Sequence, residues 1–567
     1  MIVAILDWGF DWEHDDLGPG TDGYENIYLN DQDTWTIWDE PNSGDESDND
    51  ENGYIDDWKG WGEMHDVNHY PVFYQGNDVR NYDYDWLLEY CQYDEPLAKA
   101  FWMHGTFLSG IIGAKTNNGY GISGIAGGWH DKGVSMLFYK LGVTGEEGAL
   151  TSDVAWGIEY AMYKLPHEHK AKIIELALQT LENSFITNAL QDAYNNGAFI
   201  VAAAGNHGEG SDFSVSYPAN LDFVFAVGAT TDQDLRKSNS NYGDELDIGA
   251  PGENIFGLVP QTNSYNGFEL IEGGNTSAAS AMVAGTAALM CSVNPDLTNQ
   301  AIADTLKAAA DKGTYYTYDE NGHNDEIGHG RLNAYKAVCK AGQSAPILEI
   351  EADETWDYSR SFLRSVHVKS GVTLTINADI QFGPEAALVI ESGGTLVVNN
   401  STLTNMKCCD HENTSWPGIE VWGYPNAQQF KYPLLPYPQG VIILNGATIE
   451  NAVTAINLWK PDDYTMTGGI VEAYNSTFKN NVMSAHALYY RNFNPLYPTQ
   501  ELDYYGIFTN CAFIIDQYYL GDMTFNKHVD LCHVRGLQFN GCTFSLNHEA
   551  SNISEWSDGI AAYNAGF

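Results

Sequence analysis

Apolar and polar positions follow different patterns in the two parts of this chain. In the first part, continuous apolar runs such as IVAILD at residues 2–7 and FIVAA at residues 199–203 alternate with stretches of helical periodicity such as ITNALQDAY at residues 186–194. Runs that are apolar on both faces are typical of strands buried between helices, so the pattern predicts a doubly wound α/β domain with a parallel sheet. Sites in such sheets lie at the carboxyl ends of the strands.

The pattern changes after Gly342, where helical periodicity stops and short apolar strands follow one another. A short element of Asn followed by small residues recurs in this part at Asn400, Asn445, Asn475, Asn510 and Asn540. Its intervals of 45, 30, 35 and 30 residues are typical of a solenoid whose rungs carry loops of different length. We therefore predict a first domain at residues 1–342 and a right-handed parallel β-helix at residues 343–567, with a β-sandwich as the alternative for the second domain.

Composition narrows the classes of partner. The 567 residues include 76 Asp and Glu against 26 Lys and Arg, which gives a formal net charge of -50. So strong a negative charge repels nucleic acid and anionic membranes, and no apolar run approaches the ~18 residues of a membrane-spanning helix. The sequence therefore predicts no nucleic-acid partner and no membrane span. It also shows no basic and apolar leader of the kind that directs export.

The segment GGNTSAASAMVAGTAAL at residues 273–289 carries the first candidate for chemistry. Its glycines and Asn-Thr-Ser step precede a run of small residues that predicts a tightly packed helix, with Ser277 at its start. The unpaired N–H groups at the start of a helix stabilise negative charge on a bound carbonyl, which suits a nucleophile. The alternative is that Ser277 only caps a buried helix, because serine is a favoured N-cap residue.

A serine nucleophile needs a base and a group that orients the base, and the chain offers both. Asp7 ends the first apolar strand, where a buried parallel strand presents a carboxylate at the edge of the sheet. His104 begins the run HGTFLSGIIG, in which small residues recur at near-helical spacing. The order along the chain is therefore Asp7, His104, Ser277.

These segments resemble the signature blocks of the subtilisin-like serine peptidases, the subtilase or peptidase S8 family. VAILDWGFDWEHDDL resembles the block around the family's aspartate, HGTFLSGIIGAKTNNGYGISGIAG the block around its histidine, and TSAASAMVAG the block around its serine. The run IVAAAGNHG at residues 200–208 resembles the strand that ends in the oxyanion-hole asparagine, which falls on Asn206. The resemblance extends from residue 2 to about residue 342.

The resemblance implies a subtilisin-like α/β fold and an endopeptidase that hydrolyses proteins or peptides. Asp7, His104 and Ser277 would form the catalytic triad, and Asn206 would bind the oxyanion. The second part resembles β-helix regions of secreted bacterial proteins, which implies a secreted or cell-surface location and a glycan or cell-surface partner. The alternative function is a catalytically inactive surface protein that uses the β-helix for adhesion or glycan binding.

The chain also departs from the family pattern. Gln179 and Thr180 stand where relatives usually carry two glycines beside the first specificity pocket, and Asn275 stands where the serine block usually has glycine. Relatives usually begin with a signal peptide and a prosegment, whereas Met1 here directly precedes the first strand. We therefore expect a chain that is truncated at its N-terminus and also at Phe567, the alternative being a family member that begins at Met1.

The eight cysteines fit no zinc-binding spacing. A domain of this size buries a sufficient core without disulfides, so we predict buried free thiols together with one or two bridges at most. The adjacent Cys408 and Cys409 are the strongest candidates for a bridge, although the sequence does not name their partners.

An acidic insertion at residues 45–63 has the spacing of a calcium loop. The candidate ligands in order are Asp48, Asp50, Asn52, the carbonyl of Tyr54, and Asp56. Gly53 permits the sharp turn, but the twelfth position is Lys59 rather than glutamate, so the missing ligand would have to be Asp57 or a group from elsewhere. The alternative is a solvated acidic turn.

A second calcium site is implied by the family resemblance. Asp16 and Asn117 match positions that bind calcium in many relatives. The partner ligand near the relatives' N-terminus has no counterpart here. Calcium would be structural at either site.

Millimolar calcium should raise the melting temperature of the protein above its value in chelator. The reason is that the carboxylates crowded at residues 45–57 repel one another unless a cation lies among them, and a ligand that binds only the folded state stabilises it. Differential scanning calorimetry in calcium, in magnesium and in chelator checks this expectation. Equal melting temperatures in calcium and in chelator would eliminate the site.

Overall fold

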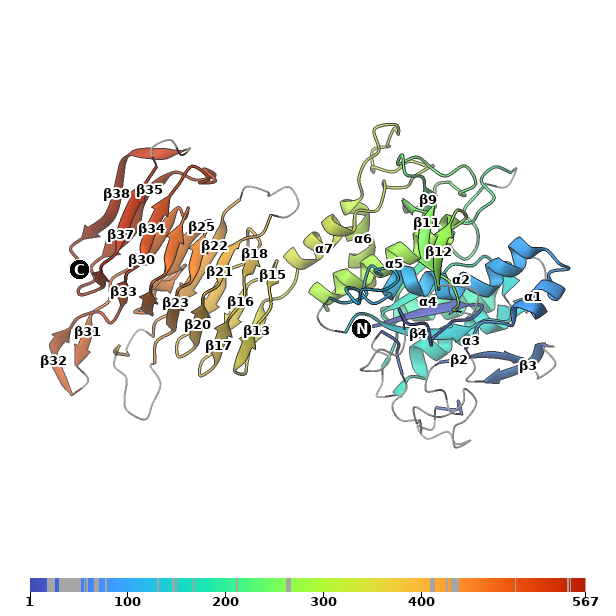
Figure 1. The fold of residues 1–567 in the computed structure, drawn as a ribbon, viewed down its shortest axis with the longest axis horizontal. Helices are drawn as coiled ribbons and strands as arrows, with labels where there is room; N and C mark the ends of the chain where they lie inside the picture. The colour runs from blue at the N-terminus through green and yellow to red at the C-terminus, as the bar shows by residue number, and fades with distance from the viewer. Residues whose placement is uncertain are drawn as a thin grey trace. The chain divides into compact units, whose positions relative to one another are not determined.

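The computed structural model divides the chain into two compact units, Met1–Ala341 and Gly342–Phe567, each with its own hydrophobic core (Figure 1). The structure describes all residues except 18–25, 30–51, 56, 58–59, 66–70, 77–78, 130–131, 145–147, 150, 167–168, 211–212, 262–266, 408–413, 425–426, 430–437, 495, 548–549, 551 and 566–567.

A sheet forms the centre of the first unit. Its strands are β1 Ile2–Asp7, β2 Trp61–His65, β3 Pro71–Gly76, β4 Ser135–Lys140, β7 Ile173–Leu176, β8 Phe199–Ala203, β9 Phe225–Thr230 and β10 Ile248–Pro251. In the described part of the chain their order is β10-β9-β8-β7-β1-β4-β2-β3, and every neighbouring pair is parallel except β2 with β3. The chain goes from β1 to β4 on one side and later fills the other side from β7 to β10. The winding direction therefore changes beside β1, where ligand sites of such sheets lie.

Helices cover both faces of this sheet. They are α1 Tyr84–Tyr90, α2 Glu95–Gly113, α3 Thr151–Tyr163, α4 Ser184–Asn195, α5 Asn275–Val293, α6 Asn299–Ala309 and α7 Ala334–Gln343. Val3 and Ile5 of β1 belong to a core with α2, α5, α6 and α7, whereas Ile2, Ala4 and Leu6 belong to a core with α3 and α4. Because β1 is buried on both faces, the alternation confirms the predicted doubly wound α/β domain. Two antiparallel hairpins complete the described elements, β5 Val143–Thr144 with β6 Gly148–Ala149 and β11 Ile255–Leu258 with β12 Phe268–Ile271.

The helix α5 lies inside the first unit. By length and composition alone it would be able to cross a membrane, and it is the one such helix among the residues that the structure describes, with a mean hydropathy of 1.4. However, 72% of that stretch is buried within the protein. Its small residues permit close packing, since a Cβ added at Gly285 would lie 2.9 Å from the Cβ of Ile125. We therefore interpret α5 as the central core helix.

Three parallel sheets build the second unit. The first consists of β13 Leu348–Ile350, β16 Val366–Val368, β19 Leu388–Ile390, β22 Trp416–Val421, β25 Ala452–Asn457, β30 Met483–Ala487, β35 Phe525–Cys532 and β38 Ile553–Tyr563. The second consists of β14 Glu354–Trp356, β17 Thr373–Ile376, β20 Thr395–Asn399, β23 Val441–Asn445, β28 Ile470–Tyr474, β33 Ile507–Thr509 and β36 Gln538–Asn540. The third consists of β15 Arg360–Phe362, β18 Ile380–Phe382, β21 Thr402–Asn405, β24 Thr448–Glu450, β29 Thr477–Lys479, β34 Ala512–Ile515 and β37 Thr543–Leu546.

Each turn of the chain adds one strand to each of these sheets, and neighbouring strands pair in parallel. This stacking confirms the predicted parallel β-helix. The β-sandwich alternative is wrong, because a sandwich is built from antiparallel sheets. Two antiparallel hairpins also occur, β26 Trp459–Lys460 with β27 Asp463–Thr467 and β31 Asn492–Asn494 with β32 Tyr497–Leu502.

A left-handed residue links the second sheet to the third in successive rungs. The φ angles at this position are 48° at Asn400, 65° at Gly446, 51° at Asn475, 53° at Asn510 and 64° at Gly541. Asn445 and Asn540, which the sequence pattern placed in the same register, lie one residue earlier at strand ends. The predicted repeat is therefore displaced by one residue in two rungs. The reason is that Gly and Asn both tolerate the left-handed conformation, so either can occupy the turn.

Aromatic rings stack on one another from rung to rung of the β-helix. Phe478, Phe513 and Phe544 hold matching positions in β29, β34 and β37. Their ring centroids are 4.9 and 4.6 Å apart, with interplanar angles of 9° in both pairs. The side chains at this register position therefore stack at the spacing of the parallel ladders, with Phe478 and Phe513 buried and Phe544 exposed.

The cysteines described by the structure are free thiols. They are the buried Cys91, Cys291, Cys339 and Cys511 and the half-buried Cys532 and Cys542. The prediction of buried free thiols is thus confirmed for the four buried positions. Cys408 and Cys409, the candidates for a bridge, lie outside the described residues.

Asn510→Ala should lower the free energy of unfolding of the β-helix by about 1 kcal/mol more than Asn510→Gly does. The left-handed backbone disfavours a residue with a Cβ, whereas glycine adopts it freely. Both substitutions remove the 3.4 Å hydrogen bond from Asn510 Nδ2 to Asn475 Oδ1, so their difference isolates the backbone term. Urea titrations of the second unit's unfolding measure it, and equal stabilities of the two variants would contradict this account of the turn.

Candidate active site

Asp7 and His104 meet at the carboxyl end of β1. His104 Nδ1 lies 2.7 Å from Asp7 Oδ2, and Asp7 Oδ1 accepts a hydrogen bond from the Trp8 N–H at 2.7 Å. Asp7 is only 3% exposed, so these contacts hold its carboxylate in place. An ionised carboxylate can only accept, which assigns the imidazole proton to Nδ1 and leaves Nε2 as an acceptor.

His104 lies in the middle of a helix rather than at the head of one. The helix α2 begins at Glu95, and the Asp94 side chain caps it by accepting from Leu97 N–H. The approach of α2 to the loop after β1 requires glycine at position 105, since a Cβ there would lie 2.3 Å from the carbonyl oxygen of Gly9. The small residue after the histidine therefore brings the imidazole to the strand end.

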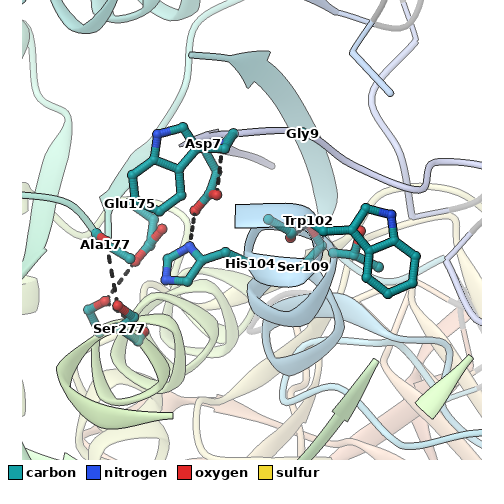
Figure 2. A network of polar contacts seen from close by, with 12 residues as sticks. Asp7, Gly9, Trp102, His104, Ser109, Glu175, Ala177 and Ser277 are labelled. Carbon is teal, nitrogen blue, oxygen red and sulfur yellow. Dashed lines mark hydrogen bonds and ion pairs between the residues drawn. The ribbon is translucent and has the colours of Figure 1, made fainter. Parts of the chain in front are cut away.

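Ser277 occupies the first turn of α5. The N-cap of this helix is Gly274, which makes no side-chain capping bond, so the alternative that Ser277 is the cap is wrong. Ser277 Oγ donates to the carbonyl oxygen of Ala177, at the end of β7, over 3.5 Å. In Figure 2 the His104 ring lies between the Asp7 carboxylate and Ser277. The φ of Asn275 is 52°, which explains why this position takes Gly or Asn.

Asn206 faces the start of α5 from the loop after β8. Its Oδ1 accepts from the Thr276 N–H at 3.1 Å and from Thr276 Oγ1 at 2.8 Å. Because these two donors fix the oxygen, the amide NH₂ group is directed away from Thr276 and remains a donor. The loop needs glycine at position 205, where φ is 106° and a Cβ would lie 2.5 Å from Ser216 Oγ.

One cavity of about 680 Å³ connects these groups. His104, Asn206 and Ser277 line it, whereas Asp7 lies behind the imidazole. Gln179 also lines the cavity and accepts from Ser216 Oγ at 3.3 Å. The structure therefore brings the predicted base, nucleophile and amide donor to one cavity wall, with a side chain where relatives usually have glycine.

Trp8 covers the histidine from one side. Its ring centroid lies 5.0 Å from that of His104, at an interplanar angle of 58°, and 4.9 Å from that of Phe101, edge-on. Trp8 also lines the cavity. The indole thus limits both the rotation of the imidazole and its access to water.

Glu175 is a site residue that the sequence reasoning missed. It lies in β7, beside β1, and is completely buried. Burial raises the pKa of Glu175 to about 8; the Ser280 hydroxyl opposes this shift, and the charge of Asp7 adds to it. The available signal was an acidic residue inside the apolar run IIELAL, where a charge is costly unless it is paired.

The first predicted calcium loop lies largely outside the described residues, which exclude Asp48, Asp50 and Asp56. Asn52 Oδ1 accepts from Tyr54 N–H at 2.7 Å, and Asn52 Nδ2 donates to Asp57 Oδ2 at 3.0 Å. Asp57 also accepts from Tyr160 Oη at 2.8 Å and is 1% exposed. Its Oδ2 atom therefore has two donors within the fold, which does not favour it as the missing calcium ligand.

At the second predicted calcium pair, Asp16 is hydrogen-bonded to residues that follow Asn117 in the chain. Asp16 accepts from Asn118 Nδ2 at 2.6 Å and from Ile122 N–H at 2.8 Å, whereas Asn117 is exposed. Asn118 presents N–H rather than oxygen to Asp16, because its Oδ1 accepts from Tyr120 N–H. Both carboxylate oxygens of Asp16 therefore accept hydrogen bonds within the fold, and calcium at this pair stays a prediction. Within the described ranges, no group of three or more His, Cys, Asp or Glu side chains is arranged to hold a metal, and the calcium ligands stay a prediction.

Comparison with known proteins gives a consistent result. A model described as the subtilase family matches residues 1–330. The cell wall-associated protease of Bacillus subtilis (strain 168) is 34% identical over 271 residues, which are 44% of this chain and 28% of that protein. Thermitase of Thermoactinomyces vulgaris is 36% identical over 238 residues, 41% of this chain and 74% of thermitase. The thermophilic serine proteinase of Bacillus sp. (strain AK1) is also 36% identical over 238 residues, 41% of this chain and 52% of that protein.

Proposed function

The chain belongs to the subtilase family, and on that premise we propose that it is a serine endopeptidase whose peptidase domain is residues 1–342. The observation that carries the proposal is the 2.7 Å contact between His104 and Asp7 beside a cavity that His104, Ser277 and Asn206 also line. Residues 343–567 are proposed as an appended β-helix domain.

In the proposed mechanism Ser277 Oγ attacks the carbonyl carbon of the scissile peptide bond. A rotation of the Ser277 side chain from the Ala177 carbonyl toward His104 lets Nε2 accept the hydroxyl proton. Asp7 keeps the imidazole in the tautomer that this step needs and stabilises the imidazolium that forms. His104 then returns the proton to the leaving amine, and water repeats the sequence to release the acid product.

The oxyanion is proposed to bind between the Asn206 side-chain amide and the Ser277 N–H. Two features support this assignment. The Asn206 oxygen is engaged by Thr276, so its NH₂ group is the part that is available. The Ser277 N–H lies in the first turn of α5, where backbone donors and the helix dipole favour negative charge.

Protein or peptide substrates and a secreted or cell-surface location are proposed from the names of the relatives, which are proteases and include a cell wall-associated one. Gln179 adds a side chain to the cavity wall that would contact the substrate. The size of the first specificity pocket is therefore set by this residue and is not carried over from relatives that have glycine. Calcium is proposed only as a structural ion, and no step of the mechanism depends on it.

A fluorophosphonate probe should label Ser277, and Ser277→Ala should abolish both the labelling and the hydrolysis of casein. In the proposed mechanism Ser277 Oγ is the nucleophile, so it is the atom that would form the covalent bond to the probe. Ser292→Ala is the matched control, because Ser292 lies exposed near the end of the same helix and donates to the Leu289 carbonyl. Labelling or hydrolysis that survives in Ser277→Ala would reject the assignment.

Asn206→Leu should lower kcat about 100- to 1,000-fold and leave KM within a few-fold of the parent value. An oxyanion donor acts as charge develops in the transition state, so its loss affects turnover more than substrate binding. Steady-state kinetics on a peptide anilide measure both constants, with Asn220→Leu, an exposed asparagine elsewhere in the unit, as the control. A raised KM with unchanged kcat would mean that Asn206 binds the ground state instead.

A further inference from the structure

The hydroxyl of Ser280 lies within hydrogen-bond distance of two oxygen atoms. Ser280 Oγ is 2.7 Å from Glu175 Oε1 and 2.9 Å from the carbonyl oxygen of Ser277. A hydroxyl carries one proton, and a carbonyl oxygen can only accept. If Glu175 were ionised, Ser280 could satisfy the carboxylate or the Ser277 carbonyl, but not both.

A proton on Glu175 satisfies both contacts. The acid then donates from Oε1 to Ser280 Oγ, and Ser280 donates its own proton to the Ser277 carbonyl, the usual partner of a helical serine three residues later. The surroundings favour the neutral acid. Glu175 is completely buried, and the effect of burial on its pKa outweighs the opposing effects of the Ser280 hydroxyl and the Ala177 N–H.

The charges around Glu175 point the same way. Asp7 faces it from β1, with His104 beyond Asp7. The neighbouring β8 and the helix α5 contain no Asp, Glu, Lys, Arg or His. An ionised Glu175 would therefore place a second carboxylate beside Asp7 without a cation to compensate it, at a cost that burial increases.

We propose that Glu175 is a positioning residue that keeps its proton, donates it to Ser280, and so lets Ser280 hold the Ser277 carbonyl in the first turn of α5. This inference rests on the proposed function, because it assigns Glu175 to the support of the proposed nucleophile. Loss of the proton would turn Ser280 toward Glu175, remove its hydrogen bond to the Ser277 carbonyl and add a charge next to Asp7.

The consequence for pH dependence has a definite sign. The pKa of Glu175 is raised by burial from 4.5 to about 8. A carboxyl whose pKa is higher in the folded state contributes stability that is complete below its unfolded pKa and is lost as pH rises through the folded value. The stability that Glu175 contributes therefore falls between pH 4.5 and about pH 8, whereas in the folded protein the acid keeps most of its proton at pH 6 to 7 and loses it above about pH 8.

Infrared difference spectroscopy tests the protonation state without any activity. On a Ser277→Ala background, which prevents self-digestion, subtracting the Glu175→Gln spectrum at pH 6 should leave the C=O band of one protonated carboxylic acid. Ser280→Ala on the same background should move that band to higher wavenumber, because the acid loses the acceptor of its proton. The proposal would be overturned if neither the Glu175→Gln nor the Ser280→Ala difference spectrum contained a band of a protonated carboxylic acid. If Glu175→Gln does not fold, the shift of the band in Ser280→Ala tests the protonation state by itself.

The pH profile of kcat tests the positioning role. The parent enzyme should lose turnover with an apparent pKa of about 8, with KM nearly constant. Glu175→Gln, which keeps a donor for Ser280 without an ionisable group, should retain turnover at alkaline pH, whereas Glu175→Leu should lose at least tenfold at every pH. Glu159→Gln, on the exposed side of α3, is the control and should keep the parent profile. An alkaline limb that is identical in the parent and in Glu175→Gln would overturn the role, whereas inactivity of the parent enzyme would contradict the proposed function instead.

Discussion

Close contact between the strand ends and two helices is the constraint on which the site depends. Gly105 lets α2 reach the loop after β1, and the alanine-rich α5 lies directly against β7 and β8. A larger side chain at Gly105 would collide with the Gly9 carbonyl oxygen. Since a packed interior does not yield by small amounts, such a collision would displace the imidazole from Asp7. The polar atoms of the site are therefore few, and the small residues around them determine how far apart they lie.

The sequence was sufficient to predict those site residues that lie at the end of a strand or at the start of a helix. Asp7 ends one apolar strand, Asn206 follows another, and Ser277 begins a run of small residues, so strand and helix patterns locate all three. Residues that act through contacts distant in sequence were not predictable in this way. Glu175 is buried and hydrogen-bonded to Ser280, which lies 105 residues later in the chain. The pairing of Asp16 with Asn118 rather than Asn117 likewise depends on how one loop turns.

The β-helix shows a related limit. The parallel solenoid was predictable because short strands and a recurring asparagine alternate along the sequence. The register was not, because Asn and Gly exchange at the left-handed turn between the second and third sheets. Only the parallel ladders, which pair Asn399 with Asn445 and Thr509 with Asn540, identify equivalent positions. A repeat defined by backbone conformation is therefore less visible in sequence than one defined by a side chain.

The register also affects which asparagines of the β-helix are open to deamidation. Asn445 and Asn540 each precede a glycine, and such Asn-Gly pairs deamidate when the glycine nitrogen attacks the asparagine side chain. In the β-helix the Gly446 N–H donates to the Tyr474 carbonyl oxygen at 2.9 Å, and this bond holds the nitrogen in place. Among the described residues, the Gly541 N–H has no such acceptor. Asn540 is also the more exposed of the two asparagines. Position within the solenoid, rather than local sequence, thus determines which of two identical dipeptides is chemically protected.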